Sequence, residues 1–147
     1  MRDIILESGI SFEKVSMIPI GINLSYFKKQ TKSIKNRIRK KLNIPKSAIV
    51  IGSFQKDGVG WGEGLEPKLI KGPDVFLKVI EILKEEIPEL FVLLTGPTRG
   101  YVKKGLTKLN VPFKHCYIKH YPGIGELYQA LDVYIISSRQ EGGPKAV

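Results

Sequence analysis

The sequence is poor in the residues that build covalent and metal-bound frameworks. Of 147 residues, only Cys116 is cysteine and only two are histidine. A single thiol excludes an internal disulfide and a metal site built from several cysteines. Cys116 stands in the apolar-rich run FKHCYI, which favours a buried and unreactive thiol. His115 and His120 lie five positions apart around an expected strand, so we expect them on opposite faces and not as a metal-binding pair.

Long hydrophobic runs are also lacking. No stretch approaches the ~18–20 apolar residues that a transmembrane helix needs. The N-terminal sequence MRDIILESGISFEK has too short an apolar run and too many acids for a signal peptide. Together with the single cysteine, these absences lead us to expect a cytoplasmic protein.

The charges are ordinary in number but uneven in sign. Charged residues make up 26% and hydrophobic residues 42%, as in soluble globular proteins, yet the net charge is +10. Between Lys28 and Lys41 there are eight Lys or Arg and no acid. An anionic partner (nucleic acid, phosphate groups or the inner face of an acidic membrane) and a solvated helix face with a basic linker both account for this segment, and we favour the second. Only Tyr26 and Phe27 stand beside it, so it lacks the stacking residues of single-strand binders and nucleic acid is not expected as a partner.

From residue 48 onward, apolar runs of strand length alternate with stretches of helical periodicity. The run 48–54 is continuously apolar, as in strands buried on both faces of a parallel sheet. The stretch 73–87 carries a broad apolar stripe, with proline at its start and after its end. This alternation predicts an α/β fold with a Rossmann-like, doubly wound parallel sheet. The expected strands are 48–54, 90–94, 113–118 and 133–136, with a short one at 15–20, and the expected helices are 2–8, 34–42, 73–87, 101–109 and 124–131.

The common phosphate-binding loops are absent from the sequence. Neither GxxxxGK[ST] nor a tight GxGxxG after a strand is present, and the glycines from Gly58 to Gly64 recur at every second position, which matches neither. They stand in a connection from 55 to 71, far longer than the ~2–6 residues typical after a strand. The sequence leaves open whether this connection is a functional loop or a disordered insertion.

Polar and basic residues follow each expected strand. The carboxyl ends of parallel strands meet at one edge of a doubly wound sheet, where ligands bind. Lysines and helix N-termini at this edge suit a phosphate or diphosphate. A carboxylate there would repel phosphate and instead accept hydrogen bonds from sugar hydroxyls. We therefore expect a sugar nucleotide in a crevice bordered by Lys56, Lys71-Gly72, Gly96 to Arg99, Lys119 to Tyr121 and Ser137 to Gly143.

The last sixteen residues, DVYIISSRQEGGPKAV, carry a resemblance to a known family. An apolar strand followed by a glutamate and a small glycine motif resembles the signature of retaining nucleotide-sugar glycosyltransferases with the GT-B fold, of the large family 4 (group 1) type. Other segments resemble parts of that pattern in the same order, namely PIGIN with Phe27, RKKLNIP, Gly52 with Lys71-Gly72, and ELYQALD. Where the family usually has arginine after the first-strand glycine, this sequence has Ser53.

The resemblance implies a domain arrangement. Residues 1–30 would form the interdomain connection and the end of an N-terminal domain, and residues 31–147 the donor-binding, C-terminal half of a GT-B fold. The family's second glutamate stands eight positions after the first, which is two positions beyond Val147. We therefore expect a donor domain that is incomplete at its C-terminus, lacks the acceptor-binding domain, is inactive alone and self-associates through an uncovered face.

The resemblance also implies roles for individual residues. The intact enzyme would transfer a hexose from a UDP- or GDP-linked sugar to an acceptor hydroxyl with retention, in polysaccharide biosynthesis. Lys56 and Lys71 would stabilise the leaving diphosphate and Glu141 would hold sugar hydroxyls, and these three are the expected catalytic residues. No cofactor and no metal are expected. The expected donor-binding residues are Gly52, Gly72, Gly96, Arg99, His120, Tyr121, Ser138, Gly142 and Gly143, with the loops 96–99 and 119–121 lining the base.

Two other functions stay open at this point. A GT-B-related nucleotide-sugar epimerase would use the same donor site. A non-enzymatic basic α/β module would bind nucleic acid through the Lys28–Lys41 segment, with a steep dependence on salt. The nucleotide base, the sugar and the acceptor are not specified by the sequence.

Overall fold

A computed structural model of the chain describes residues 2–16, 18 and 21–141. Its centre is a parallel sheet of four strands in the order β3-β2-β1-β4. The strands lie where the alternating pattern predicts them, and the first, third and fourth are each two residues shorter than expected. Their bounds are β1 Ile49–Ser53, β2 Leu90–Thr95, β3 Phe113–Cys116 and β4 Val133–Tyr134.

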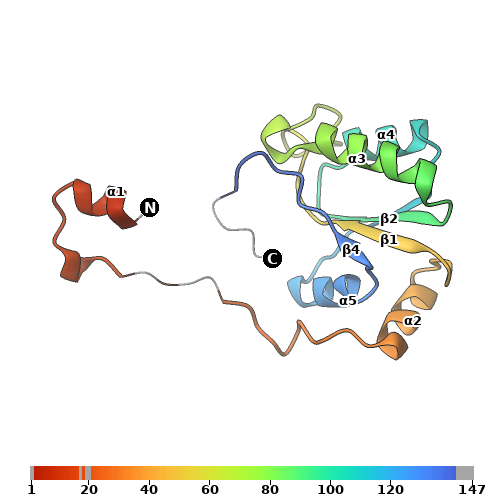
Figure 1. Ribbon diagram of the computed structural model, residues 1–147, viewed down its shortest axis with the longest axis horizontal. Coiled ribbons are helices and arrows are strands. Elements are labelled where there is room, and N and C mark those ends of the chain that lie inside the picture. Colours follow the sequence, from red (N-terminus) through yellow and green to blue (C-terminus); the bar gives the residue numbers. More distant parts are fainter. Residues whose placement is uncertain (1, 17, 19–20, 142–147) are drawn as a thin grey trace.

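Helices cover both faces of this sheet (Figure 1). On one face lie α3 (Pro73–Glu86) and α4 (Gly100–Lys108), and on the other lie α2 (Lys32–Lys41) and α5 (Ile124–Tyr128). A short α1 (Arg2–Glu7) lies apart from the sheet, and 3-10 turns occur at Phe12–Lys14, Leu69–Lys71 and Tyr121–Gly123. All five expected helices are therefore present, within a few residues of their predicted ends.

The strand expected at 15–20 is wrong for the residues described there. Val15, Ser16 and Ile18 belong to no strand, and 85% of Ile18 is exposed. An apolar run becomes a strand only where a neighbouring strand takes its hydrogen bonds. The four strands of the sheet pair with one another and not with this segment.

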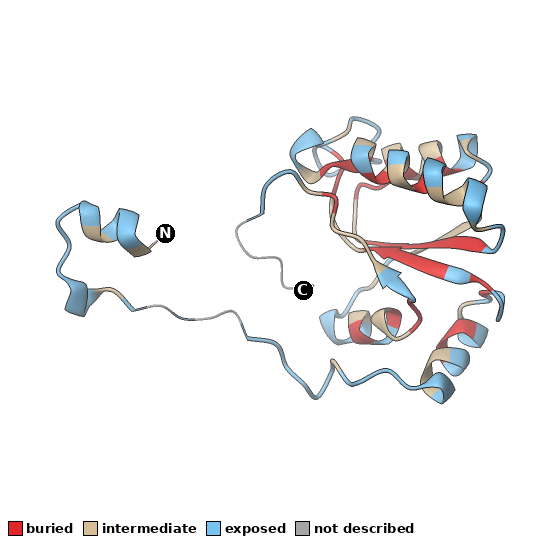
Figure 2. Cartoon of the chain, viewed as in Figure 1, coloured by how far each residue is buried: buried red, intermediate tan, exposed pale blue. Residues whose placement is uncertain are grey.

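The core consists of two apolar layers, one on each face of the sheet (Figure 2). Successive residues of a strand point to opposite faces, so Val50 contributes to one layer and Ile51 to the other. The first layer joins α2 and α5 to the sheet, through Ile38 and Leu127. The second joins α3 and α4, through residues such as Phe76. The prediction that the first strand is buried on both faces is thus confirmed.

Asp132, just before β4, ties α2 to the sheet. Its carboxylate accepts hydrogen bonds from the Val50 N–H at 2.7 Å and from Arg39 at 2.5 Å, and it also pairs with Lys35. Arg39 is 95% buried and donates further to the carbonyls of Ala130 and Ala48, each at 2.9 Å. Burial alone would raise the pKa of Asp132, but the hydrogen bonds from Lys35, Val50 and Arg39 outweigh it and lower the pKa.

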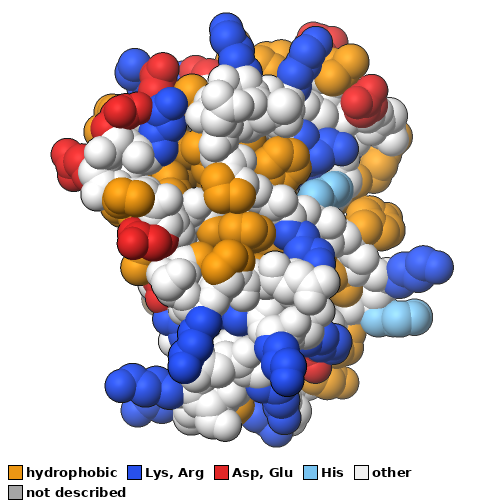
Figure 3. Space-filling view, turned by 90° about the vertical axis from the view of Figure 1, so that its right-hand side faces the viewer, with side chains coloured by type: hydrophobic (Ala, Val, Ile, Leu, Met, Phe, Trp, Pro, Cys, Tyr) orange, Lys and Arg blue, Asp and Glu red, His pale blue; other side chains and the backbone are white. Residues whose placement is uncertain are grey.

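The basic segment 28–41 therefore divides into structural and solvent-facing cations. Lys35 and Arg39 hold Asp132, and Lys41 pairs with Glu126 of α5 at 2.8 Å. The other basic residues of the segment are exposed. Figure 3 shows Lys and Arg side chains gathered on the lower part of the face that Figure 1 has on its right, where α2 lies. In the part of the chain that the structure describes, no helix has the length and apolar character needed to cross a bilayer.

Candidate functional site

The strand order places a topological switch point between β1 and β4. The chain runs from β1 outward through β2 to β3, and then crosses back to form β4 on the other side of β1. In open α/β sheets the ligand crevice lies outside the carboxyl ends of the two strands at such a point. Here those ends lead into residues 54–57 and 135–141, and α3 begins beside them.

Lys71 and Glu141 meet at this edge. The Lys71 Nζ lies 2.7 Å from Glu141 Oε1, and the Ser138 hydroxyl donates to the same oxygen at 2.6 Å. The hydrogen bond from Lys71, and next that from Ser138, lower the pKa of Glu141. Both charged side chains stay about a quarter exposed, at 28% and 25%. Three residues expected from the sequence are thus brought into direct contact.

Gly72 allows the start of α3 to approach the loop after β4. It has a left-handed conformation (φ +62°), and a Cβ added to it would lie 1.9 Å from the Ser137 carbonyl oxygen. Only glycine fits both requirements. Arg139 braces the same contact, because its backbone N–H donates to Ile70 and its guanidinium forms a two-pronged pair with Asp74 at 2.6 and 2.9 Å. The expected glycine therefore contributes through its backbone, which lets the start of α3 lie against the loop after β4.

The long connection 55–71 is folded and not an irregular insertion. A bridge joins Gly58 to Pro67, and the Lys68 N–H donates to the Asp57 carbonyl at 2.7 Å. Lys56 lies at its start, with its ammonium 3.6 Å from the centroid of the Trp61 ring. Trp61 is among the most exposed large hydrophobic residues that the structure describes, at 86%. Lys56 thus makes a cation–π contact, and among the described contacts it touches neither Lys71 nor Glu141.

Arg99 points inward, away from the open side of the edge. It is 1% exposed, and its guanidinium donates to the carbonyls of Ser53 (2.9 Å), Gln55 (2.5 Å) and Thr95 (3.2 Å). It also lies 3.1 Å from the carboxylate of Asp57. Burial raises the pKa of Asp57 to about 6, with Arg99 opposing the rise. In this geometry Arg99 holds the ends of β1 and β2 together, whereas the sequence suggested that it lines the nucleotide base.

Sequence reasoning missed Asp57 and Gln55 altogether. Asp57 could not be found from the sequence, because the burial of Arg99, which requires an acid beside it, is seen only in the structure. Gln55 has no sequence signal either, since its contacts depend on where two distant loops meet.

A small hollow of about 180 Å³ lies beside β2 and the turn before α5. It brings Gly96 and Tyr121 together, as expected from the sequence, and Phe54 and Tyr117 also line it. Gly96 has a left-handed conformation (φ +93°), and its carbonyl contacts His115 at 2.8 Å. His120 is exposed and does not line this hollow.

Gly52 has a packing role in the structure. A Cβ at Gly52 in β1 would lie 2.3 Å from a methyl carbon of Leu131, so its small size lets Leu131 pack on the strand. Gly142 and Gly143, which were expected to supply backbone N–H groups, lie outside the described residues. The donor-binding roles of these three glycines stay predictions.

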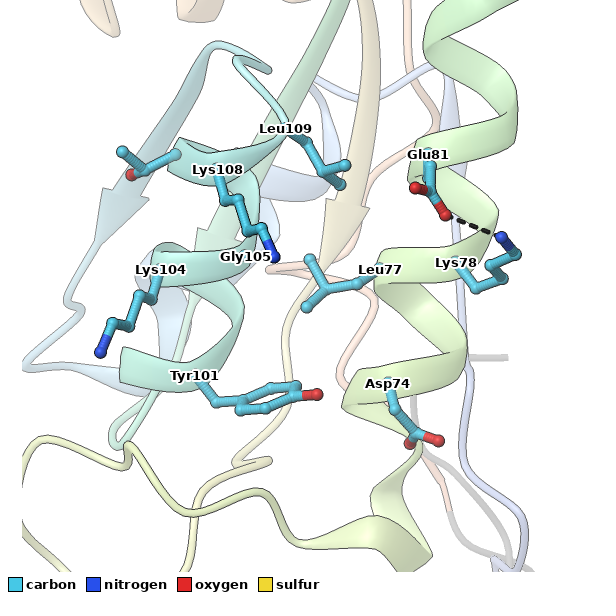
Figure 4. Close-up of a pocket in the computed structure, with 10 residues that line it drawn as sticks. Asp74, Leu77, Lys78, Glu81, Tyr101, Lys104, Gly105, Lys108 and Leu109 are labelled. Carbon is cyan, nitrogen blue, oxygen red and sulfur yellow. Dashed lines mark hydrogen bonds and ion pairs between the residues drawn. The ribbon is translucent and has the colours of Figure 1, made fainter.

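A larger hollow lies elsewhere. A groove of about 840 Å³ runs between α3 and α4 (Figure 4). Leu77 points into it toward α4, where a Cβ on Gly105 would lie 2.3 Å from a Leu77 methyl carbon. Its walls are the outward sides of two helices, and none of the residues after β1 or β4 lines it. We therefore place the candidate site at the switch point and not in this groove.

The parallel sheet with helices on both faces defines a class of protein, the Rossmann-like α/β fold, as the sequence predicted. Two solved structures are similar to it. A glycosyltransferase from Rickettsia africae superposes with a TM-score of 0.63 at 20% identity, covering 88% of this chain and 33% of that one. Anabaena HepE, solved in complex with UDP and glucose, gives 0.58 at 20% identity, covering 93% and 35%. At this identity the likeness concerns the fold, and the chain spans about a third of the length of either structure.

The family is identified from the amino-acid sequence. Residues 65–147, more than half of the chain, match the model of the glycosyl transferases group 1 family. The chain belongs to this family. No curated protein matches it.

Proposed function

We propose that this chain is the donor-binding domain of a glycosyltransferase that moves a hexose from a nucleoside diphosphate sugar to an acceptor hydroxyl, with retention at the anomeric carbon. The observation that carries the proposal is the Lys71–Glu141 pair at the switch point of a group 1 glycosyl transferase domain. The similarity to a structure solved with UDP and glucose supports a UDP-sugar as the first donor to test.

The pair offers both kinds of contact that such a donor needs. An ammonium group stabilises negative charge that develops on a leaving diphosphate, and it does so best when it is held in place beforehand. A carboxylate accepts hydrogen bonds from sugar hydroxyls. In the structure the two groups form an ion pair with each other, with 2.7 Å between Lys71 Nζ and Glu141 Oε1. When the donor binds, the diphosphate would replace Glu141 as the partner of the Lys71 ammonium. The sugar hydroxyls would donate hydrogen bonds to the Glu141 carboxylate, and the Ser138 hydroxyl would be a further hydrogen-bond donor in the site.

Binding of nucleotides to the chain tests this proposal. We expect UDP to bind at millimolar concentration or below in calorimetric or NMR titrations, with GDP and ADP compared under the same conditions. Lys71→Ala removes a charge-assisted contact and should weaken UDP binding by about ten- to a hundredfold. It should leave the weaker binding of uridine unchanged.

Lys78→Ala is the matched control. Lys78 also pairs with a glutamate, Glu81, at 2.8 Å, but it lies on the outward side of α3. This substitution should leave UDP binding unaltered. Absence of binding for all three nucleotides at millimolar concentration would overturn the donor site, and equal effects of the two substitutions would overturn the role of Lys71.

A further inference from the structure

We propose that Gln55 is the positioning residue of this site: its side-chain amide joins the two loops that carry Lys71 and Glu141 across the switch point. The proposal deepens the proposed function and rests on it for its purpose, whereas the contacts themselves can be tested without any nucleotide.

The amide of Gln55 contacts both loops. Its Nε2 donates to the Lys71 carbonyl at 2.8 Å and lies 3.4 Å from the Ser137 hydroxyl. Its Oε1 lies 3.3 Å from the Ser138 hydroxyl. The orientation of the amide follows from the first contact, because a carbonyl accepts only from the NH₂ end. Gln55 therefore spans from the segment before α3 to the segment after β4.

The backbone of Gln55 is itself held rigidly. Its carbonyl accepts from the buried guanidinium of Arg99 at 2.5 Å, and Arg99 also binds carbonyls of β1 and β2. The side chain thus extends from a fixed point at the end of β1. Arg99 therefore supports the site indirectly: its guanidinium faces the interior and holds the backbone of Gln55 in place.

The Ser138 hydroxyl links Gln55 to Glu141. It has one proton and two acceptors in reach, Glu141 Oε1 at 2.6 Å and Gln55 Oε1 at 3.3 Å. The shorter contact takes the proton in the free protein. When sugar hydroxyls occupy Glu141, Ser138 can turn its proton to Gln55, so that no hydroxyl is left unsatisfied.

This bridge matters because the two charged groups come from loops far apart in the chain. Lys71 and Glu141 are separated by seventy residues, and each is about a quarter exposed. Groups that act together on a ligand are effective when a second set of contacts fixes their separation before binding. Gln55 supplies such contacts to both loops at once.

The test compares Gln55→Met with Gln30→Met in the whole chain. Methionine keeps the length of glutamine but removes both ends of the amide. Gln30 is the matched control, because its Nε2 also bridges two carbonyls, those of Gln129 and Leu131, each at 2.9 Å, away from the crevice. Two readouts are recorded: the pKa of the Glu141 carboxyl by NMR, and the dissociation constants of UDP and uridine.

We expect Gln55→Met to raise the pKa of Glu141 toward its ordinary value, because the hydrogen bonds from Lys71 and Ser138 to the carboxylate weaken. UDP binding should weaken by about three- to tenfold, with uridine unchanged. Gln30→Met should alter neither quantity. An unchanged Glu141 pKa in folded Gln55→Met protein would overturn the positioning role.

Two further outcomes keep the test decisive. If Gln55→Met does not fold, Gln55→Asn replaces it, since asparagine keeps the amide but is one methylene too short to reach both loops, and the same shifts are expected. If wild-type protein binds no nucleotide, the donor site fails while the Glu141 pKa still decides the role of Gln55.

Discussion

Substitution of Asp132 by alanine should destabilise the whole domain, although Asp132 lies at the sheet's edge. The change removes the carboxylate that pairs with Arg39, which is 95% buried, and leaves the Val50 N–H in β1 without its acceptor. Breaking a buried ion pair from one side costs about 3–5 kcal/mol. The Asp132 side chain is 22% exposed, so water relieves part of this cost. We therefore expect a loss of about 3 kcal/mol in the free energy of unfolding.

Urea denaturation followed by circular dichroism measures this loss. With a slope of about 2 kcal/mol per molar urea, a loss of about 3 kcal/mol lowers the midpoint by about 1.5 M. Glu126→Gln is the matched control, because it also removes an acid that pairs with a lysine of α2. That pair is 54% and 67% exposed, so its loss should change stability by less than about 1 kcal/mol.

The pH dependence gives a second check. The pKa of Asp132 is lower in the folded chain than the ordinary 3.8, so its contribution is present above that pH and is lost as pH falls through the folded value. The difference between wild type and Asp132→Ala should therefore shrink below pH 3.8. The reasoning is refuted if Asp132→Ala lowers the midpoint no more than Glu126→Gln does.

Two further predictions concern the connection 55–71. Asp57 has a folded pKa of about 6 against an ordinary 3.8, so the folded chain binds its proton more tightly and stability should fall by about 3 kcal/mol as pH rises from 3.8 to above 6. Unfolding free energies measured across this range should show a flatter profile for Asp57→Asn, and identical profiles would contradict the buried acid. Trp61 is the chain's single tryptophan and carries the Lys56 ammonium over its ring, so UDP that recruits Lys56 should change its fluorescence. Lys56→Ala should abolish that change, and a full UDP response in Lys56→Ala would remove Lys56 from the site.

The sequence predicted the architecture well because periodicity and burial go together. The run 48–54 is apolar except at Ser53, and in the structure β1 is packed by helices on both faces. Topology brings the strand ends to one edge, which is why the sequence could place Lys71 and Glu141 at the same edge although they lie 70 positions apart. Their ion pair is seen only in the structure. The strand expected at 15–20 was wrong because an apolar run does not show whether another strand lies beside it.

The direction of individual side chains could not be predicted in the same way. Arg99 follows β2 as a ligand-binding cation would, but it turns inward, where carbonyls of β1 and β2 and the buried Asp57 attract it. Gln55 stands among polar residues with no motif around it. Its role depends on the meeting of two loops from separate strands, which no local pattern encodes. The cytoplasmic location, the domain boundary at residue 30 and the absence of a cofactor stay predictions.

The folded base of the connection 55–71 has a consequence for chain cleavage. On one side of Trp61 the Val59 N–H binds the Glu66 carbonyl, and on the other the carbonyls of Glu63 and Gly64 bind the start of α4. A protease that cuts after the exposed Trp61 would therefore produce two pieces that remain assembled, because both new ends are fastened within three residues of the cut. The same position could serve as new termini in a circular permutant without loosening the edge of the sheet.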